Sequence, residues 1–76
     1  MPRAEQLLRV LLAVRGYPNR AAWLRASGLS SRTIVRMLDG RPVRPSSVRK
    51  VAESLGAKAS DIEDLVGAAR EDRGRS

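Results

Sequence analysis

The side chains with the clearest chemical potential in this sequence are arginines at helical spacing. Arg32 and Arg36 stand four residues apart. The apolar residues among and after them are Ile34, Met37 and Leu38. At about 100° per residue, the three apolar side chains share one face of a helix and both arginines point away from it. A guanidinium that projects into solvent can donate parallel hydrogen bonds to a planar acceptor or bind an anion. The spacing predicts a helix over residues 31–39 with a cationic outer face.

Side chains for catalysis or metal binding are scarce. The 76 residues include no His and no Cys, so the usual ligands of structural zinc, the commonest general base and the thiol nucleophile are all missing. The remaining Ser, Asp and Glu residues stand beside no partner base, nucleophile turn or phosphate-binding loop. We therefore expect no enzyme activity, no metal and no cofactor.

The positive charge is concentrated in one part of the chain. The formal net charge is +7, and residues 1–50 hold eleven basic residues against two acidic ones, whereas residues 51–76 hold four against six. A basic surface confined to part of a domain is the electrostatic footprint of a polyanion partner, with nucleic acid first and an anionic membrane second. Composition alone fits a solvated basic surface equally well.

Length and hydropathy limit the chain to one small domain. Apolar residues make up 42% of it and aromatic residues 3%, which favours an aliphatic core between small helices. The longest apolar run, residues 10–14, is far shorter than the roughly 20 residues that span a bilayer. Charged residues also continue through the N-terminal segment, where a secretory signal needs an apolar stretch. We expect a cytoplasmic protein with no membrane partner.

Five segments have the apolar spacing of short helices, and none alternates with the two-residue period of a strand. They cover residues 3–15, 20–27, 31–39, 47–55 and about 61–70. The expected N-caps are Asn19, Ser30 and Ser46, and a capping box is expected from Ser60 and Glu63. The expected C-caps are Gly16, Gly28, Gly40 and Gly56. The sequence predicts an all-α domain, a compact bundle of about five short helices over residues 1–70, with a charged, flexible tail over residues 71–76.

Residues 20–40 have the order of a helix-turn-helix unit, because two short helices flank a turn that contains glycine. Two prolines then make residues 41–45 a non-helical, basic connector. The chain resembles the Cro/repressor-type (Xre-like) helix-turn-helix family from about residue 5 to residue 66. The residues that carry the resemblance are, in order, Gly28-Leu29-Ser30, Ile34, Met37-Leu38, Gly40, Pro45-Ser46 and Leu55-Gly56. It implies a lambda-repressor-like DNA-binding domain whose second motif helix lies in the DNA major groove.

The resemblance implies base contacts from Ser31, Arg32 and Arg36, and a phosphate or outer-base contact from Arg20. The position of Val35, beside the arginines on the wheel, suits contact with a thymine methyl group. Further contacts to the DNA backbone are expected from Tyr17, Arg41, Arg44 and Arg49.

Two positions depart from the family pattern. Leu24, beside Trp23, stands where a small residue commonly lets the two motif helices approach closely. Asp39 stands where Asn commonly donates to a phosphate, and a pairing with Arg36 or Arg41 is its alternative role. Trp23 itself is expected in the core. The apolar stripe of the fifth helix is expected in the core as well, with a dimer contact as the alternative, and consists of Ile62, Leu65, Val66 and Ala69.

These features predict a sequence-specific double-stranded-DNA-binding protein, a small repressor-like transcriptional regulator of prokaryotic, phage or plasmid context that is associated with the nucleoid. One short helix reads few base pairs, so we expect a homodimer on an inverted-repeat operator. Two alternatives stay open. One is a DNA-binding antitoxin or a plasmid or phage control protein, and the other is a protein-interaction module that uses the same fold.

Overall fold

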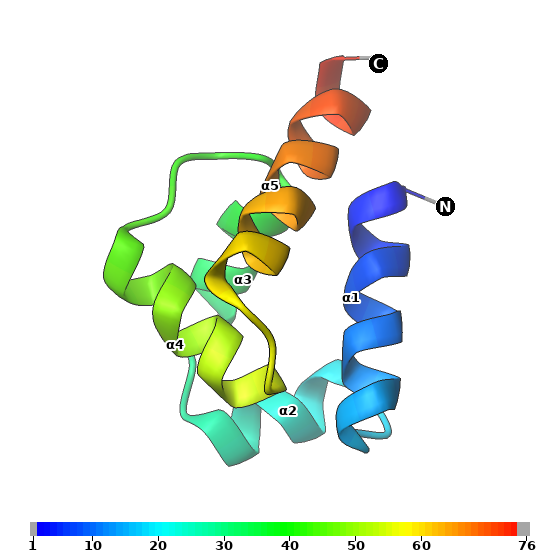
Figure 1. Cartoon of the computed structure of the whole chain (residues 1–76), viewed down its shortest axis with the longest axis vertical. Coiled ribbons are helices and arrows are strands. Elements are labelled where there is room, and N and C mark those ends of the chain that lie inside the picture. Colours follow the sequence, from blue (N-terminus) through cyan, green and yellow to red (C-terminus); the bar gives the residue numbers. More distant parts are fainter. Residues whose placement is uncertain (1, 75–76) are drawn as a thin grey trace.

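The computed structural model describes residues 2–74 and contains five α-helices, so the prediction of an all-α fold is confirmed (Figure 1). Their bounds are α1 Arg3–Arg15, α2 Arg20–Ser27, α3 Ser31–Leu38, α4 Pro45–Leu55 and α5 Ala59–Gly74. No strand is present within residues 2–74. In the same range no helix combines the length and the apolar character needed to cross a membrane.

Helix α5 is the element against which three of the other described helices pack. It contacts α1, α3 and α4, with α1 beside it and α3 behind it in Figure 1. Its apolar stripe is buried in the core of the same chain, with the members Ile62, Leu65, Val66 and Ala69. The core interpretation of this stripe is therefore confirmed. A dimer contact by these four side chains is contradicted, because the other helices already cover them.

Trp23 ties α2 to α4. The side chain is fully buried, and its Nε1 donates a hydrogen bond of 2.8 Å to Oγ of Ser54. The Ser54 hydroxyl in turn donates to the Val51 carbonyl at 2.7 Å, so the indole N–H and the hydroxyl are both satisfied. The predicted place of Trp23 in the core is confirmed. Leu24, next to it, packs half-buried against the same core.

Side-chain caps start α2 and α3 as the sequence predicts. Asn19 accepts a hydrogen bond from the Ala22 N–H at 2.8 Å, and Ser30 accepts one from the Arg32 N–H at 3.2 Å. Each cap satisfies one of the N–H groups that the first helical turn leaves without a partner. Helix α3 is therefore fixed at its start, and it ends at Leu38, one residue earlier than predicted.

The starts of α4 and α5 differ from the prediction. Helix α4 begins at Pro45, so Ser46 lies inside the helix instead of capping it. Proline fits the first helical position because its φ is suitable and that position needs no N–H. Helix α5 begins at Ala59, and the carboxylate of Asp61 accepts a hydrogen bond from the Lys58 N–H at 3.1 Å. The predicted capping box of Ser60 and Glu63 is wrong, because this hydrogen bond caps the helix at Lys58, two residues before Ser60, and Ser60 lies inside the helix.

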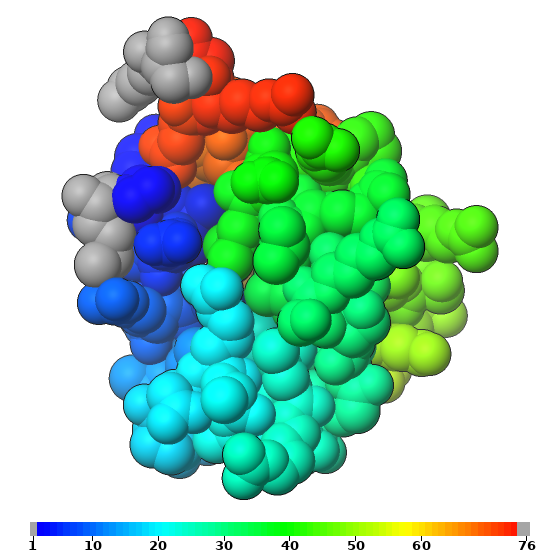
Figure 2. Space-filling model, turned by 180° about the vertical axis from the view of Figure 1, so that it is seen from behind, coloured from blue at the N-terminus to red at the C-terminus, as the bar shows by residue number. Residues whose placement is uncertain are grey.

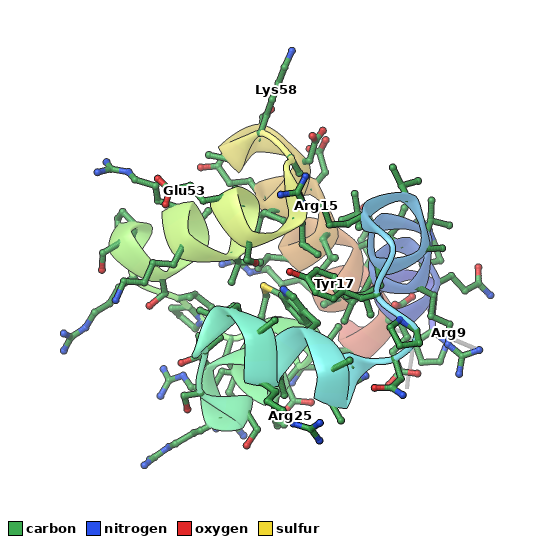
Figure 3. The ribbon with its side chains drawn as sticks, turned by 90° about the horizontal axis from the view of Figure 1, so that it is seen from below. Arg9, Arg15, Tyr17, Arg25, Glu53 and Lys58 are labelled. Atoms are coloured by element: carbon green, nitrogen blue, oxygen red, sulfur yellow. The ribbon has the colours of Figure 1, made fainter. Side chains whose placement is uncertain are left out.

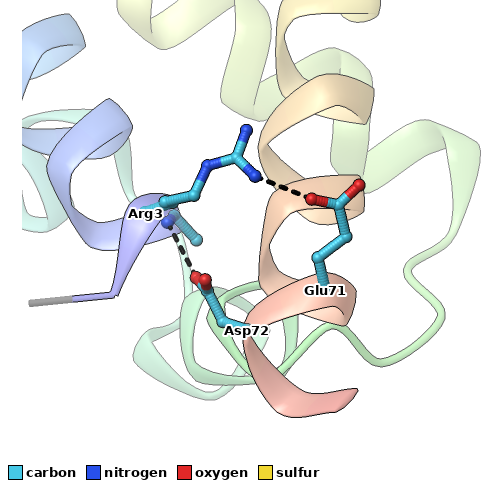
Figure 4. A network of polar contacts seen from close by, with 4 residues as sticks. Arg3, Glu71 and Asp72 are labelled. Carbon is cyan, nitrogen blue, oxygen red and sulfur yellow. Dashed lines mark hydrogen bonds and ion pairs between the residues drawn. The ribbon is translucent and has the colours of Figure 1, made fainter. Parts of the chain in front are cut away.

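The predicted boundary of the tail at residue 71 is also wrong, because α5 continues to Gly74. Arg3 and Glu71 form an ion pair of 2.7 Å, and the Ala4 N–H donates to the Asp72 carboxylate at 3.2 Å (Figure 4). These contacts hold the last turns of α5 against the first turn of α1. The rest of the predicted tail, residues 75–76, lies outside the described residues.

Candidate nucleic-acid interface

One side of the molecule is formed by α2, α3 and the segment that links α3 to α4. Figure 2 shows this side, with α2 in cyan below the green of α3 and of the linking segment. The segment between α3 and α4 covers residues 39–44, not the predicted 41–45, because α3 ends at Leu38 and Pro45 begins α4; we call residues 39–44 the connector from here on. Asp61, Glu63 and Asp64 belong to the first turns of α5, whereas Asp72, near its end, lines a hollow together with Asp39 and Arg41 of the connector. The exposed face of α3 is therefore the candidate for binding a polyanion.

Helix α3 separates its polar and apolar side chains sharply. Ile34 and Met37 are completely buried, whereas Val35 is 52% exposed. The four predicted base-contact residues are all exposed on the side of α3 that faces away from the core, namely Ser31, Arg32, Val35 and Arg36. The structure thus brings these four together on one surface.

A hollow of about 320 Å³ lies between α3, the connector and the first turn of α4. Three arginines line it, Arg32, Arg36 and Arg44, together with Thr33 and Ser47. Among residues 2–74, no Asp or Glu lines it. Charge and hydrogen-bond donors therefore suit a phosphate group at this place.

The other predicted backbone contacts fall in different surroundings. Arg41 is exposed in the connector. Arg20 is exposed at the first position of α2, and its Nη2 lies 3.8 Å from the Glu5 carboxylate. Because both side chains are about two-fifths exposed, this ion pair is weak, and Arg20 stays accessible to another anion such as a phosphate.

Arg49 does not join this surface. It lines a separate hollow between α4 and α5, together with Glu63 and Arg70. Lys50, the next residue, instead lies with the α2–α3 turn, in a hollow of about 680 Å³ that shares Thr33 and Ser47 with the first one. Lys50 was missed by the sequence reasoning. No local sequence pattern could have found it, because the side of α4 that faces the α2–α3 turn follows only from the packing of this helix.

Tyr17 lies in the same larger hollow. Its side chain is half-buried and points inward between α2 and α4, near Arg15 (Figure 3). Its ring packs against the core. Tyr17 is therefore not brought to the outer face of α3.

The connector is joined to α3 and α5 by specific contacts. Nη2 of Arg36 donates to the Pro42 carbonyl at 3.2 Å. Nε of Arg70 donates to the Gly40 carbonyl at 3.1 Å. The alternative pairing of Asp39 with Arg36 or Arg41 is contradicted, since no such pair lies within 4.0 Å in the described part of the chain. The partner of Arg36 is a carbonyl, which neutralises no charge.

Comparisons of the chain with protein-family models, with curated proteins and with solved structures find no match. Evidence on function therefore comes from the surface of this molecule alone.

Proposed function

We propose that the protein binds double-stranded DNA with sequence specificity, using α2 and α3 as a helix-turn-helix unit with α3 in the major groove. The observation that carries the proposal is the solvent-facing surface of α3, which exposes Arg32, Val35 and Arg36, together with the adjoining hollow that three arginines line. With its side chains, an α-helix such as α3 is about 10–12 Å in diameter. A B-DNA major groove is about 12 Å wide and admits such a helix.

The exposed side chains would have two roles on DNA, contact with bases and contact with phosphates. Arg32 and Arg36 can each donate two parallel hydrogen bonds to O6 and N7 of guanine, and Val35 can contact a thymine methyl group. Arg41 and Arg44 lie in the connector that follows α3, and Arg20 lies at the start of α2. At these places they would hold phosphates without reading sequence. Bound protein would act by occupying its site, as a small repressor-like transcriptional regulator does. A DNA-binding antitoxin or a plasmid or phage control protein would use the same surface.

A homodimer on an inverted repeat is part of the proposal, and α1 is its candidate contact. The stripe of α5 is buried, whereas α1 exposes Leu7 by 41%, Val10 by 59% and Val14 by 81%. These residues follow one another by three and four positions, so they share a stripe of the helix. The same exposed stripe favours the second candidate function, a protein-interaction module, in which α1 would bind another protein.

Selection of bound duplexes from a random pool tests the proposal directly. We expect enrichment of an inverted repeat whose half-sites lie about one helical turn apart. Enrichment of an asymmetric site would keep DNA binding and remove the dimer. No enrichment, together with no salt-dependent binding to any duplex, would reject the proposal and favour the protein-interaction module.

A further inference from the structure

At the beginning of the connector, backbone groups of Gly40 and Arg41 are hydrogen-bonded to two helices. The Arg41 N–H donates to the Arg36 carbonyl at 3.0 Å, which continues the end of α3. One residue earlier, the carbonyl of Gly40 is bound by Arg70 of α5. Gly40 is buried and has a φ of +72°, and its Cα faces the backbone of α5 directly. The connector therefore leaves α3 from a fixed point.

The rest of the connector has little conformational freedom. Val43 packs half-buried against the core. The Arg44 carbonyl accepts hydrogen bonds from the N–H groups of Ser47 and Val48 at 2.9 and 3.0 Å, which joins it to α4. Pro42 fixes its own φ and limits the conformation of the residue before it. The Pro42 carbonyl is thus presented at a defined place beside α3.

The side chain of Arg36 is hydrogen-bonded to this carbonyl. A free arginine side chain has many rotamers, and ordering it on DNA lowers affinity. In this structure Nη2 of Arg36 is already bonded to Pro42. A guanidinium has five N–H donors, so one bond to a carbonyl leaves enough donors for a bidentate contact to guanine. The bond can therefore orient the side chain without blocking its reading of a base.

We propose that the Pro42 carbonyl is a positioning group for Arg36, which makes the connector a determinant of DNA sequence specificity although it touches no base. This inference rests on the proposed function, because it assigns Arg36 to base reading. Arg32 and Arg44 border the same hollow, yet only Arg36 of the three has this bond. The effect should therefore be confined to the base pair that Arg36 reads.

The test compares Pro42→Ala with Pro45→Ala. Alanine keeps the carbonyl at residue 42 but frees the backbone that aims it, whereas Pro45 lies inside the first turn of α4 and its replacement is the matched control. Each variant is titrated with the selected duplex and with duplexes that carry single base-pair exchanges. Arg36→Ala first identifies the pair that Arg36 reads.

We expect Pro42→Ala to lower the preference at that pair by roughly three- to tenfold, the effect of releasing one ordered side chain. Preference at the other pairs should stay unchanged, and so should all preferences of Pro45→Ala. In the Arg36→Ala background, Pro42→Ala should have no further effect at that pair. An equal loss of affinity on every duplex, or additive effects of the two substitutions, would overturn the inference.

A measurement without DNA separates this inference from the proposed function. Nuclear magnetic resonance relaxation of the arginine Nε–H groups reports side-chain order on the picosecond to nanosecond scale. We expect Arg36 of the unmodified protein to be more ordered than Arg44, and to lose that order in Pro42→Ala. Equal disorder of both arginines in the unmodified protein would overturn the positioning role, whatever the protein binds. Absence of duplex binding with an ordered Arg36 would reject the proposed function and, with it, the specificity role.

Discussion

Gly40 and Arg70 lie in direct contact, although 30 residues separate them in the sequence. Nε of Arg70 donates to the Gly40 carbonyl at 3.1 Å, and a Cβ on residue 40 would lie only 2.7 Å from the backbone nitrogen of Arg70. The end of α3 thus rests on the backbone of α5. This contact fixes how far the exposed face of α3 stands from the core.

Gly40→Ala should destabilise the protein by about 2–4 kcal/mol. The left-handed backbone conformation accounts for about 1–2 kcal/mol, and the clash with α5 adds to it because backbone atoms cannot move aside easily. Gly28→Ala is the control, since Gly28 has nearly the same φ, +71°, with nothing within 4 Å of the added Cβ. Gly28→Ala should lose only the contribution of the left-handed backbone conformation, about 1–2 kcal/mol. Urea unfolding measures both, and equal losses would contradict the close contact.

Ser54→Ala should lower the free energy of unfolding by about 1–3 kcal/mol, because it leaves the buried N–H of Trp23 without its acceptor. The fluorescence of the single Trp follows unfolding directly. Ser46→Ala, at an exposed position of α4, is the control and should stay within about 0.5 kcal/mol of the unmodified protein. A neutral Ser54→Ala would mean that the hydrogen bond adds nothing to the α2–α4 contact.

Duplex binding should be steeply salt-dependent, with a log–log slope of roughly −4 for on the order of four to five neutralised phosphates per protomer. Arg44→Gln should make the slope less negative by about 1, because Arg44 borders the hollow beside α3. Arg49→Gln removes the same charge from the other side of α4 and should leave the slope unchanged. Identical slopes for the two variants would show that only net charge matters.

Arg32→Ala should lose roughly 1–3 kcal/mol on the selected site and relax the preference at one G·C pair. Arg44→Ala should instead weaken selected and scrambled duplexes about equally, because a phosphate contact carries no sequence information. Competition titrations with both duplexes distinguish the two patterns. The assignment of α3 as the reading helix is wrong if both variants weaken both duplexes alike.

Val10→Glu should convert a complex of two protomers per duplex into one, because it places a charge in the exposed stripe of α1. The fold should tolerate it at a position that is 59% exposed. Arg9→Gln makes the same change in net charge on the same helix at an exposed position outside the stripe, and should leave the complex intact. Sedimentation of the saturated complex counts the protomers. Two protomers per duplex for Val10→Glu would exclude α1 as the dimer contact.

Local features of the fold could be predicted where neighbouring residues alone decide the outcome. The bounds of α1 and α2 agree with the predicted ranges 3–15 and 20–27, and the caps Asn19 and Ser30 form as expected. The predicted caps were wrong where a second residue nearby could start the helix instead. Helix α4 starts at Pro45 and not after Ser46, and in α5 the hydrogen bond from the Lys58 N–H to Asp61 places the helix start ahead of Ser60.

The candidate site was predictable as a helix face but not as a hollow. The spacing of Ile34 and Met37 is enough to predict that Arg32 and Arg36 point outward, because the period of 3.6 residues per turn fixes which side chains share a face of a helix. The bond from Arg36 to Pro42 depends on the path of the connector, and that path depends on Gly40 meeting α5 thirty residues further on. The different placements of Arg49 and Lys50 also required the packing of α4, which no local pattern contains.

The contact between the first turn of α1 and the last turns of α5 sets a condition on biosynthesis. Ala4 and Leu8 are 1% exposed, and α5, with which α1 makes its largest contact, is synthesised after α1, α2, α3 and α4. A nascent chain therefore cannot dock α1 against α5 until residues 59–72 have left the ribosomal exit tunnel. Until then the leucines and valines of α1 face solvent on two sides, and they are a natural target for chaperones that hold hydrophobic segments.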